Sequence, residues 1–360
     1  MSDFFLNKRV LLTGHTGFKG SWLAIWLTRL GARVSGLALD PVTTPSLFDL
    51  ATVGNMLWDD HRVDVRDREA VARVVRRESP DIVFHLAAQP IVKTSYAQPL
   101  ETFATNVMGT LHVLDALRRM ERPAIVVVVT TDKVYENAER GEAFSEDAPL
   151  GGRDPYSASK ACTEIAAASF RASFAAQAGL RIATARAGNV IGGGDWSEHR
   201  LMPDIARAFV RGEPVRLRNP RSTRPWQHVV EPLHGYLRLA ERLGGDDHAR
   251  YETAFNLGPD LASVRDVETV AKLAATAWNA HGASTARIEV GEETDAVHEA
   301  ATLSLAIHKS LRLLEWEPRW ALEVAVTRTM DWYAHQQKGI DAAALVRRDI
   351  ERYESGRLAA

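Results

Sequence analysis

The first half of the chain alternates short, almost continuous apolar runs with longer segments whose apolar residues recur at helical spacing. Such runs are typical of strands buried on both faces of a parallel sheet, and the longer segments are typical of helices. Long helices are predicted near Leu100–Met120 and Ser159–Ala178. This alternation forms βαβ units, so we predict an α/β fold with a doubly wound parallel sheet. The predicted strands are Arg9–Thr13, Arg33–Leu39, Ile82–Leu86, Ile125–Thr130 and Ala183–Arg186.

The alternation stops after Gly188. Three glycines, Gly192–Gly194, precede the polar stretch Asp195–Arg200, and further helices and short strands are indicated beyond it. We therefore predict that residues 1–188 form the sheet domain. Residues 189–360 would form mainly a smaller α/β lobe, with some segments returning to the sheet. In doubly wound folds ligands bind at the carboxyl ends of the strands, so this lobe would bind substrate there.

The first predicted strand leads into a glycine-rich loop, Gly14-His-Thr-Gly17-Phe-Lys-Gly20, which opens a helix. Glycines allow the backbone to approach a pyrophosphate, which the helix N-terminus attracts. The second strand ends near Asp40, where an acidic side chain binds the adenosine ribose and repels a 2′-phosphate. We predict a Rossmann-type domain that binds NAD rather than NADP. The loop and acid supply the predicted cofactor-binding residues Gly14, Thr16, Gly17, Phe18, Lys19, Gly20 and Asp40.

Other residues near this motif have more than one interpretation. Lys19 would either contact a phosphate or stay solvated. Asp64, followed by Val65, would either bind the adenine amino group or cap the helix that follows. Trp22 and Trp26 share one helix with several leucines, and their spacing favours core packing over contact with the cofactor.

Two further motifs carry acid–base chemistry. Tyr156 and Lys160 lie four residues apart, hence on one helical face, where the ammonium would lower the phenol pKa. Such a phenol can take a proton from a sugar hydroxyl as a hydride leaves the same carbon. Directly after the strand Ile125–Thr130 come Thr131, Asp132 and Lys133. The Asp–Lys pair is a second acid–base couple that simple alcohol oxidation does not require.

Composition narrows the class of protein. The 360 residues are 46% hydrophobic, and 44 basic residues balance 46 acidic ones, so no basic patch suggests nucleic acid. The single cysteine, Cys162, excludes an internal disulfide framework and fits a cytoplasmic location. No apolar run predicts a membrane span or a signal segment. The 12 histidines show no metal-ligand spacing, so we expect no metal.

These motifs resemble those of the extended short-chain dehydrogenase/reductase family over nearly the whole chain. Within it they are most similar to the sugar-nucleotide 4,6-dehydratases that act on CDP-glucose. Lysine at position 133 resembles that branch, whereas the dehydratases of dTDP-glucose carry glutamate there. The segments that carry the resemblance are Gly14–Gly20, His85–Pro90, Thr131–Tyr135, Tyr156–Lys160, Arg186–Trp196 and Arg224–His228.

The resemblance implies roles for individual residues. Thr131, Tyr156 and Lys160 match the catalytic residues, with Asp132 as the acid and Lys133 as a base or a cation in the elimination of water. Leu86, Ala87 and Ala88 would line the nicotinamide side of NAD, and Asn106 would support the sheet near the cofactor. The substrate diphosphate would be bound by Asn189 and Arg224, with Arg200 and Arg216 as weaker candidates, since guanidinium suits phosphate. Trp226 would stack on the base or belong to the core.

Several alternatives remain open. A sugar-nucleotide 4-epimerase needs only Thr131, Tyr156 and Lys160, and a UDP-uronic acid decarboxylase is a third enzyme of this type. Asp132 and Lys133 favour dehydration over both. A non-enzymatic NAD-binding scaffold would have no use for the acid–base residues. The two long helices, rich in small apolar residues, would form a homodimer interface or pack within the chain. The resemblance further implies a deoxysugar pathway of a bacterial surface polysaccharide such as O-antigen.

Overall fold

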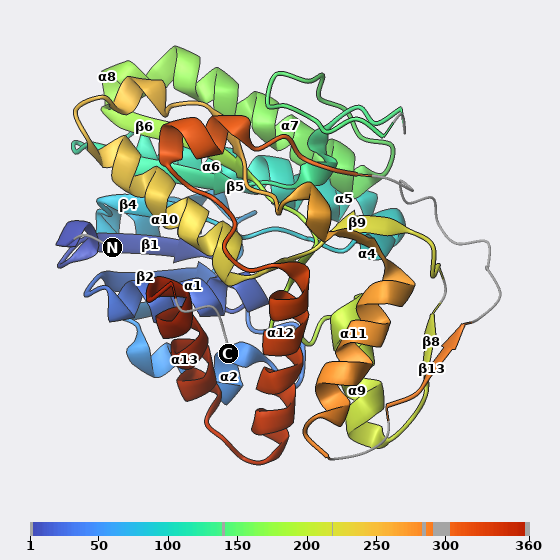
Figure 1. Cartoon of the computed structure of the whole chain (residues 1–360). Coiled ribbons are helices and arrows are strands. Elements are labelled where there is room, and N and C mark those ends of the chain that lie inside the picture. Colours follow the sequence, from blue (N-terminus) through green and yellow to red (C-terminus); the bar gives the residue numbers. More distant parts are fainter. Residues whose placement is uncertain (1–2, 139–140, 218, 283–285, 291–302, 357–360) are drawn as a thin grey trace.

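A computed structural model describes residues 3–138, 141–217, 219–282, 286–290 and 303–356. Its centre is a seven-stranded sheet of order β11-β6-β5-β4-β1-β2-β3, with every neighbouring pair parallel (Figure 1). From β1 the order runs outward in both directions, which confirms the predicted doubly wound α/β fold. The strands are β1 (Arg9–Thr13), β2 (Arg33–Ala38), β3 (Asp59–Arg62), β4 (Ile82–His85), β5 (Ala124–Val129), β6 (Leu180–Arg186) and β11 (Ala254–Asn256).

Alternate side chains of the strands enter two separate cores. Leu11, Val83 and Val126 face α3 (Arg68–Glu78) and α6 (Gly109–Leu117). Their neighbours Leu12, Phe84 and Val127 belong to the larger cluster, which includes α1 (Phe18–Arg29) and α10 (Val230–Gly244). Both faces of the sheet are therefore covered, which explains why its central strands read as continuous apolar runs.

The two long predicted helices are present, each with a π-helical turn inside it. The first consists of α5 (Pro99–Phe103), the π-turn Ala104–Met108, and α6. The second consists of α7 (Pro155–Phe170), the π-turn Arg171–Ala175, and α8 (Ala176–Ala178). α7 begins at Pro155, directly before Tyr156, so both Tyr156 and Lys160 lie in its first two turns.

The second half of the chain supplies the smaller lobe and also covers the sheet. Three two-stranded sheets pair β7 with β10, β8 with β13 and β9 with β12. Their strands are β7 (Val190–Ile191), β8 (Val215–Leu217), β9 (Thr223–Pro225), β10 (Gln227–His228), β12 (Val264–Asp266) and β13 (Ile288–Val290). The remaining helices are α2 (Leu47–Leu50), α4 (Val92–Ala97), α9 (Leu201–Arg211), α11 (Val267–Asn279), α12 (Leu322–Gln337) and α13 (Ala342–Glu354).

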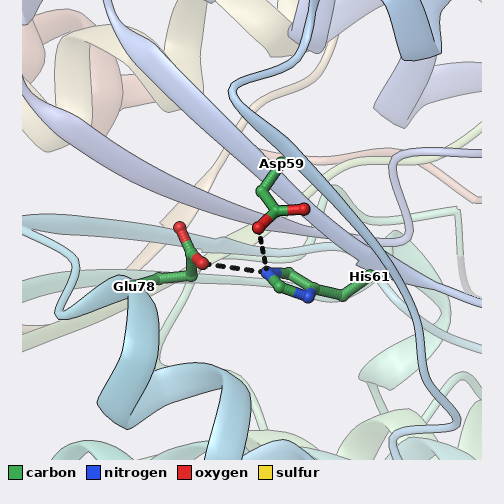
Figure 2. Close-up of side chains that lie close together, drawn as sticks. All are labelled: Asp59, His61 and Glu78. Carbon is green, nitrogen blue, oxygen red and sulfur yellow. Dashed lines mark hydrogen bonds and ion pairs between the residues drawn. The ribbon is translucent and has the colours of Figure 1, made fainter.

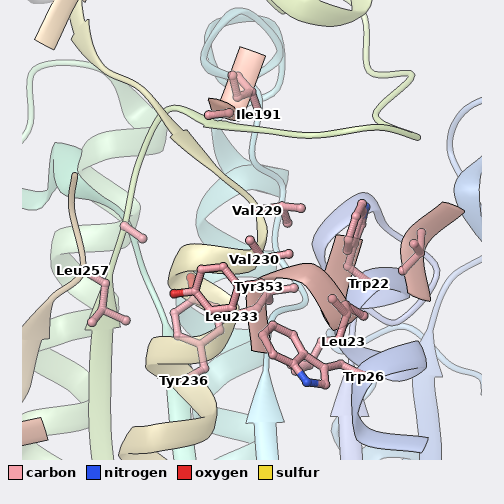
Figure 3. Packing of buried hydrophobic residues seen from close by; sticks show 14 of the residues in the cluster. Trp22, Leu23, Trp26, Ile191, Val229, Val230, Leu233, Tyr236, Leu257 and Tyr353 are labelled. Atoms are coloured by element: carbon pink, nitrogen blue, oxygen red, sulfur yellow. The ribbon is translucent and has the colours of Figure 1, made fainter. Parts of the chain in front are cut away.

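Large aromatic side chains join the lobe to the sheet domain. Trp22 and Trp26 of α1 are fully buried, as their spacing predicted, and belong to one cluster with Tyr236 of α10 and Tyr353 of α13 (Figure 3). The Trp22 indole donates to the Gly193 carbonyl at 2.9 Å. The glycine run after β7 is thereby fixed against the first helix. Among the described residues, no helix is long and apolar enough to cross a membrane.

Strand β3, at the sheet edge, was not predicted, because its sequence is polar throughout. His61 Nε2 lies 2.9 Å from Glu78 Oε1 and 3.7 Å from Asp59 Oδ2 (Figure 2). In the described part of the chain these three are the group that a metal ion would fit. Arg77 pairs with Asp59 at 2.7 Å, and Ser35 donates to Glu78 at 2.5 Å. The carboxylates therefore already have partners, and the cluster joins β3 to α3.

Gly193 offers a test of how the lobe packs. A Cβ atom added there would lie 1.9 Å from Cγ of the buried Trp332 on α12, so Gly193→Ala requires a backbone or helix shift. We expect a loss of about 1–3 kcal/mol in the free energy of unfolding, measured with denaturant. Gly245→Ala is the control, since its Cβ would make an ordinary 3.5 Å contact. Equal stability of the two variants would contradict the packing of α12 described above.

Candidate active site

A cleft of about 880 Å³ follows the carboxyl ends of the sheet strands and continues into the lobe. Its volume is within the range of small-molecule and cofactor sites. It is lined by every predicted site residue except Asn106. These are Gly14, Thr16, Gly17, Phe18, Lys19, Gly20, Asp40, Asp64, Val65, Leu86, Ala87, Ala88, Thr131, Asp132, Lys133, Tyr156, Lys160, Asn189, Arg200, Arg216 and Arg224.

The glycine-rich loop is shaped by two close backbone approaches. Gly14 has a φ of +74°, and a Cβ there would lie 2.7 Å from the backbone nitrogen of Ala87. At Gly20 a Cβ would lie 2.1 Å from the Gly14 carbonyl oxygen. Neither position has room for a side chain. Because both residues are glycine, the loop can pass close to the residues that follow β4, and α1 can begin directly after the loop. The open N–H groups of this helix face the cleft as an anion site.

The end of the cleft next to β2 carries acidic residues. Asp40 follows β2 with its side chain 87% exposed, and Arg62 Nε lies 3.6 Å from its carboxylate. Asp64 is paired with Arg66 at 2.6 Å, and hydrogen bonds from Arg66 lower the pKa of that carboxyl. The alternative that Asp64 caps the next helix is wrong, because Asp67 is the N-cap and accepts the N–H of Ala70 at 2.9 Å.

Asn106 lies behind the cleft rather than in its wall. Its side chain is fully buried, accepts the N–H of Gln89 at 2.8 Å, and donates to Ser159 Oγ at 2.8 Å. It thus joins the loop after β4 to α7, the helix that carries Tyr156 and Lys160. These contacts fit the supporting role expected of Asn106, which positions the loop and α7 from behind the cleft.

Strand β5 and helix α7 bring the acid–base residues together. α7 begins with Asp154 as N-cap, and its first turns bury Tyr156 and Lys160. Lys160 Nζ donates to the Val129 carbonyl, the last residue of β5, at 3.0 Å. The hydroxyl of Tyr156 is hydrogen-bonded to Thr131. A phenol, a hydroxyl and an ammonium therefore meet at the carboxyl end of the sheet.

The predicted lowering of the Tyr156 pKa by Lys160 is wrong for the protein alone. Burial raises the pKa of Tyr156 to about 12, and the charge of Asp132 adds to this, while Thr131 opposes it. Burial also lowers the pKa of Lys160 to about 8, which the charge of Glu164 opposes. The desolvation cost of the phenolate exceeds any gain from an ammonium that is directed at a backbone carbonyl.

Asp132 is buried at the centre of this group. Thr131 Oγ1 donates to its Oδ1 at 2.9 Å, and the Asn189 amide donates to its Oδ2 at 3.0 Å. Burial raises the pKa of Asp132, although the charge of Lys133 opposes the shift. A carboxyl with a raised pKa is suited to donate a proton. Asn189, predicted to contact a diphosphate, lines the cleft, and its amide is directed at Asp132.

The cations of the cleft differ in their surroundings. Arg224 is buried and donates to the Thr223 carbonyl at 2.8 Å, and Arg200 pairs with Asp195 at 3.1 Å. Arg216, with a side chain 80% exposed, pairs with Glu289 at 3.2 Å. Lys19 is partly buried rather than solvated, and burial together with Arg200 lowers its pKa to about 7. All four side chains thus line the cleft, and that of Arg216 is the most exposed.

Trp226 lies in both the cleft wall and the core. It is 7% exposed, and its indole donates to the Arg265 carbonyl at 3.0 Å. The indole N–H therefore has a partner within the protein, as expected if Trp226 belongs to the core.

One supporting pair was missed by the sequence argument. Glu164 accepts hydrogen bonds from Thr130 and Thr184 at 2.5 and 2.7 Å, and pairs with the buried Arg186 at 2.9 Å. It lies one helical turn after Lys160, and both side chains contact the end of β5. The four-residue spacing places Glu164 on the same face of α7 as Lys160 and could have indicated this role. A glutamate on a helix is usually exposed to solvent, so the spacing alone did not single it out.

The fold, the glycine loop and the Tyr–Lys pair together define an enzyme site of the extended short-chain dehydrogenase/reductase type. A model of the GDP-mannose 4,6-dehydratase family matches residues 11–329. The chain belongs to this family of nucleotide-sugar enzymes.

Individual relatives agree with this assignment. A CDP-glucose 4,6-dehydratase of Salmonella typhimurium is 44% identical over 358 residues, which cover 98% of each chain. The fold is similar to that of a UDP-glucose 4-epimerase of Thermotoga maritima, with a TM-score of 0.77 at 22% identity over 91% of this chain and 99% of the other. A dTDP-glucose 4,6-dehydratase of Bacillus anthracis, solved with NAD, gives 0.75 at 20% identity over 92% and 98%.

Proposed function

We propose that the protein is an NAD-dependent dehydratase that converts CDP-D-glucose into CDP-4-dehydro-6-deoxy-D-glucose. The main structural support for this proposal is Asp132, which is buried and hydrogen-bonded to Thr131. Both residues line the same cleft as Tyr156. An oxidation site alone would need no additional acid. The 44% identity to a CDP-glucose 4,6-dehydratase over 98% of both chains supports the choice of substrate.

The cleft fits a dinucleotide. Its glycine loop leaves room for a pyrophosphate at the N-terminus of α1, with Lys19 as a nearby cation, and Asp40 stands where an adenosine ribose would lie. Leu86, Ala87 and Ala88 would line the nicotinamide end, with Tyr156 and Lys160. Bound NAD would act as a reversible hydride acceptor. The sugar would be oxidised at carbon 4 and later reduced at carbon 6, so that no NAD is consumed overall.

The residues at the end of β5 and on α7 would handle the proton of the sugar 4-hydroxyl. Thr131 would hold this hydroxyl, and Tyr156 would take its proton as carbon 4 is oxidised. Because the pKa of Tyr156 is about 12 in the protein alone, the positive charge of bound ligand groups must favour the phenolate. Lys160, next to the end of β5, would bind the nicotinamide ribose while it holds α7 in place.

Water would then be lost across carbons 5 and 6. The 4-ketone acidifies the proton on carbon 5, which a base removes, and Asp132 donates a proton to the departing 6-hydroxyl. Carbon 5 regains a proton when carbon 6 is reduced, so the net change is the loss of one water. Lys133 lines the cleft next to Asp132 and is proposed either as this base or as a cation that stabilises the enolate.

A sugar-nucleotide 4-epimerase is the second candidate function, favoured by the fold similarity to the Thermotoga maritima enzyme. The same Thr131, Tyr156 and Lys160 would serve that reaction. The buried acid Asp132 is the feature against it, as it also is against a decarboxylase acting on a UDP-uronic acid. We further propose that residues 1–188 hold the cofactor, that residues 189–360 mainly hold the sugar nucleotide, and that the enzyme is cytoplasmic and serves surface-polysaccharide synthesis.

Substrate choice can be tested by mass spectrometry of the purified protein incubated with NAD and, separately, CDP-, dTDP-, UDP- and GDP-glucose. We expect the loss of one water from CDP-glucose alone. Loss of water from a different nucleotide sugar would support the dehydratase activity but refute CDP-glucose as the substrate. Isomerisation at carbon 4 of UDP-glucose without water loss would make the protein an epimerase.

The role of Lys133 can be tested with Lys133→Ala and Lys133→Arg. If Lys133 is the base, both variants should lose deuterium incorporation at carbon 5 from heavy water, with turnover lower by about 10²–10⁴-fold. If Lys133 acts only as a cation, Lys133→Arg should retain much of the deuterium incorporation and much of the turnover. Intact exchange and turnover in Lys133→Ala would show that neither role is correct.

We also propose a homodimer formed by the helices α5 and α7 and their π-turns. These neighbouring elements expose apolar side chains: Leu100 79%, Ile165 58%, Met108 46% and Phe174 36%. A charge placed there should disrupt a helix-packed interface. Light scattering should show a dimer that Ile165→Glu converts to a monomer, whereas Leu261→Glu, at an exposed apolar position between β11 and β12, leaves the mass unchanged. A monomeric parent protein would refute the proposal.

A further inference from the structure

The carboxylate of Asp132 is held by residues from two parts of the chain. Thr131, its neighbour in sequence, donates to Oδ1, and Asn189, 57 residues away, donates to Oδ2 at 3.0 Å. The Asn189 side chain can reach because its backbone is left-handed, with a φ of +49°. Asparagine is one of the few residues other than glycine that adopt this conformation readily. The sequence at this position thus matches an unusual backbone.

The residue before Asn189 allows this approach. A Cβ at Gly188 would lie 1.9 Å from Cγ of Asp132, so only glycine leaves room for the carboxylate against this backbone. Asp132 is therefore packed directly against the Gly188–Asn189 segment.

The same segment is fixed from the other side by β10. Gln227 Nε2 donates to the Gly188 carbonyl at 3.2 Å, and the Gln227 N–H donates to the Asn189 carbonyl at 3.3 Å. Gln227 is itself fully buried and also donates to the Leu257 carbonyl at 2.9 Å. A buried backbone held in this way gives the Asn189 amide a defined direction.

Charged groups from several elements face Asp132. Lys133 belongs to the same turn, Arg224 comes from β9 and Lys19 from α1, and all three favour the carboxylate. Tyr156 of α7 also lies within the influence of Asp132. To these charges Asn189 adds a directed hydrogen bond, from its side-chain amide to Oδ2, which contributes to the orientation of the acid.

We infer that Asn189 is a positioning residue for Asp132, acting on the elimination of water rather than on the affinity for the sugar nucleotide. This inference rests on the proposed dehydration. Asn189 and Thr131 fix the two carboxyl oxygens, so the proton of Asp132 points at one place in the cleft. The segment Gly188–Asn189 and Gln227 support this arrangement from behind.

Two variants test the inference. Asn189→Gly accepts the left-handed backbone but removes the amide, and Asn189→Asp keeps the shape but replaces the N–H donor with an acceptor. In both we expect kcat for dehydration to fall roughly 10- to 100-fold, with KM for CDP-glucose close to that of the parent protein. Ser79→Gly, at another left-handed position far from the cleft, should change neither constant.

A pH titration supplies a second readout that needs no turnover. Loss of the amide donor removes a contact that favours the carboxylate, so the pKa of Asp132 should rise in Asn189→Gly. It should rise further in Asn189→Asp, where a second negative charge stands beside it. The carboxyl band can be followed in the ligand-free protein by infrared difference spectra against Asp132→Asn. The alkaline limb of the kcat profile should move upward in parallel, since Asp132 acts in its protonated form.

The outcomes separate the possible errors. A rise in KM with unchanged kcat and unchanged titration of Asp132 would overturn the inference and make Asn189 a substrate-binding residue. Loss of elimination together with a shifted titration would support it. If the parent protein dehydrates no nucleotide sugar, the proposed function fails, and an unshifted titration in both variants would then independently refute the contact.

Discussion

The hydrogen bond from Lys160 Nζ to the carbonyl of Val129 fixes helix α7 against the end of β5. Everything at the centre of the cleft depends on this junction. Thr131 and Asp132 follow β5 directly, while Tyr156 precedes Lys160 by one helical turn. A shift of α7 along the sheet would separate Tyr156 from Thr131. Glu164, one turn further on, holds Thr130 and so makes a second attachment between the same two elements.

These attachments place several charges in a buried environment. Glu164 and Arg186 form an ion pair with both side chains almost inaccessible to water, and Lys160 is nearly as buried. Removing charges from water costs several kcal/mol per ion unless each is well partnered. Here the hydroxyls of Thr130 and Thr184 donate to Glu164, and the hydroxyl of Tyr135 accepts from Arg186. The same exclusion of water shifts the pKa values of Tyr156, Lys160 and Asp132 away from their ordinary ranges.

The elements predicted from the sequence match the structure where the prediction depends on residues close together in the chain. Five buried strands, the helix with Trp22 and Trp26, and the two long helices were predictable because apolar periodicity follows directly from which face is buried. Edge strand β3 was not, since a strand with few buried residues has no apolar pattern. The helix after Val65 is capped by Asp67, not Asp64, because side-chain capping depends on one particular backbone turn.

By itself, the sequence determined the five central strands, the long helices and the chemical groups that are available, because local spacing of residues carries both kinds of information. The tertiary structure alone decided how those groups behave. Tyr156 and Lys160 share a helical face, yet burial raises the phenol pKa, since desolvation depends on atoms from distant segments. The amide of Asn189 reaches Asp132 across 57 residues of chain, and Asn106 lies behind the cleft. Such contacts between distant segments have no local signature that a single sequence could reveal.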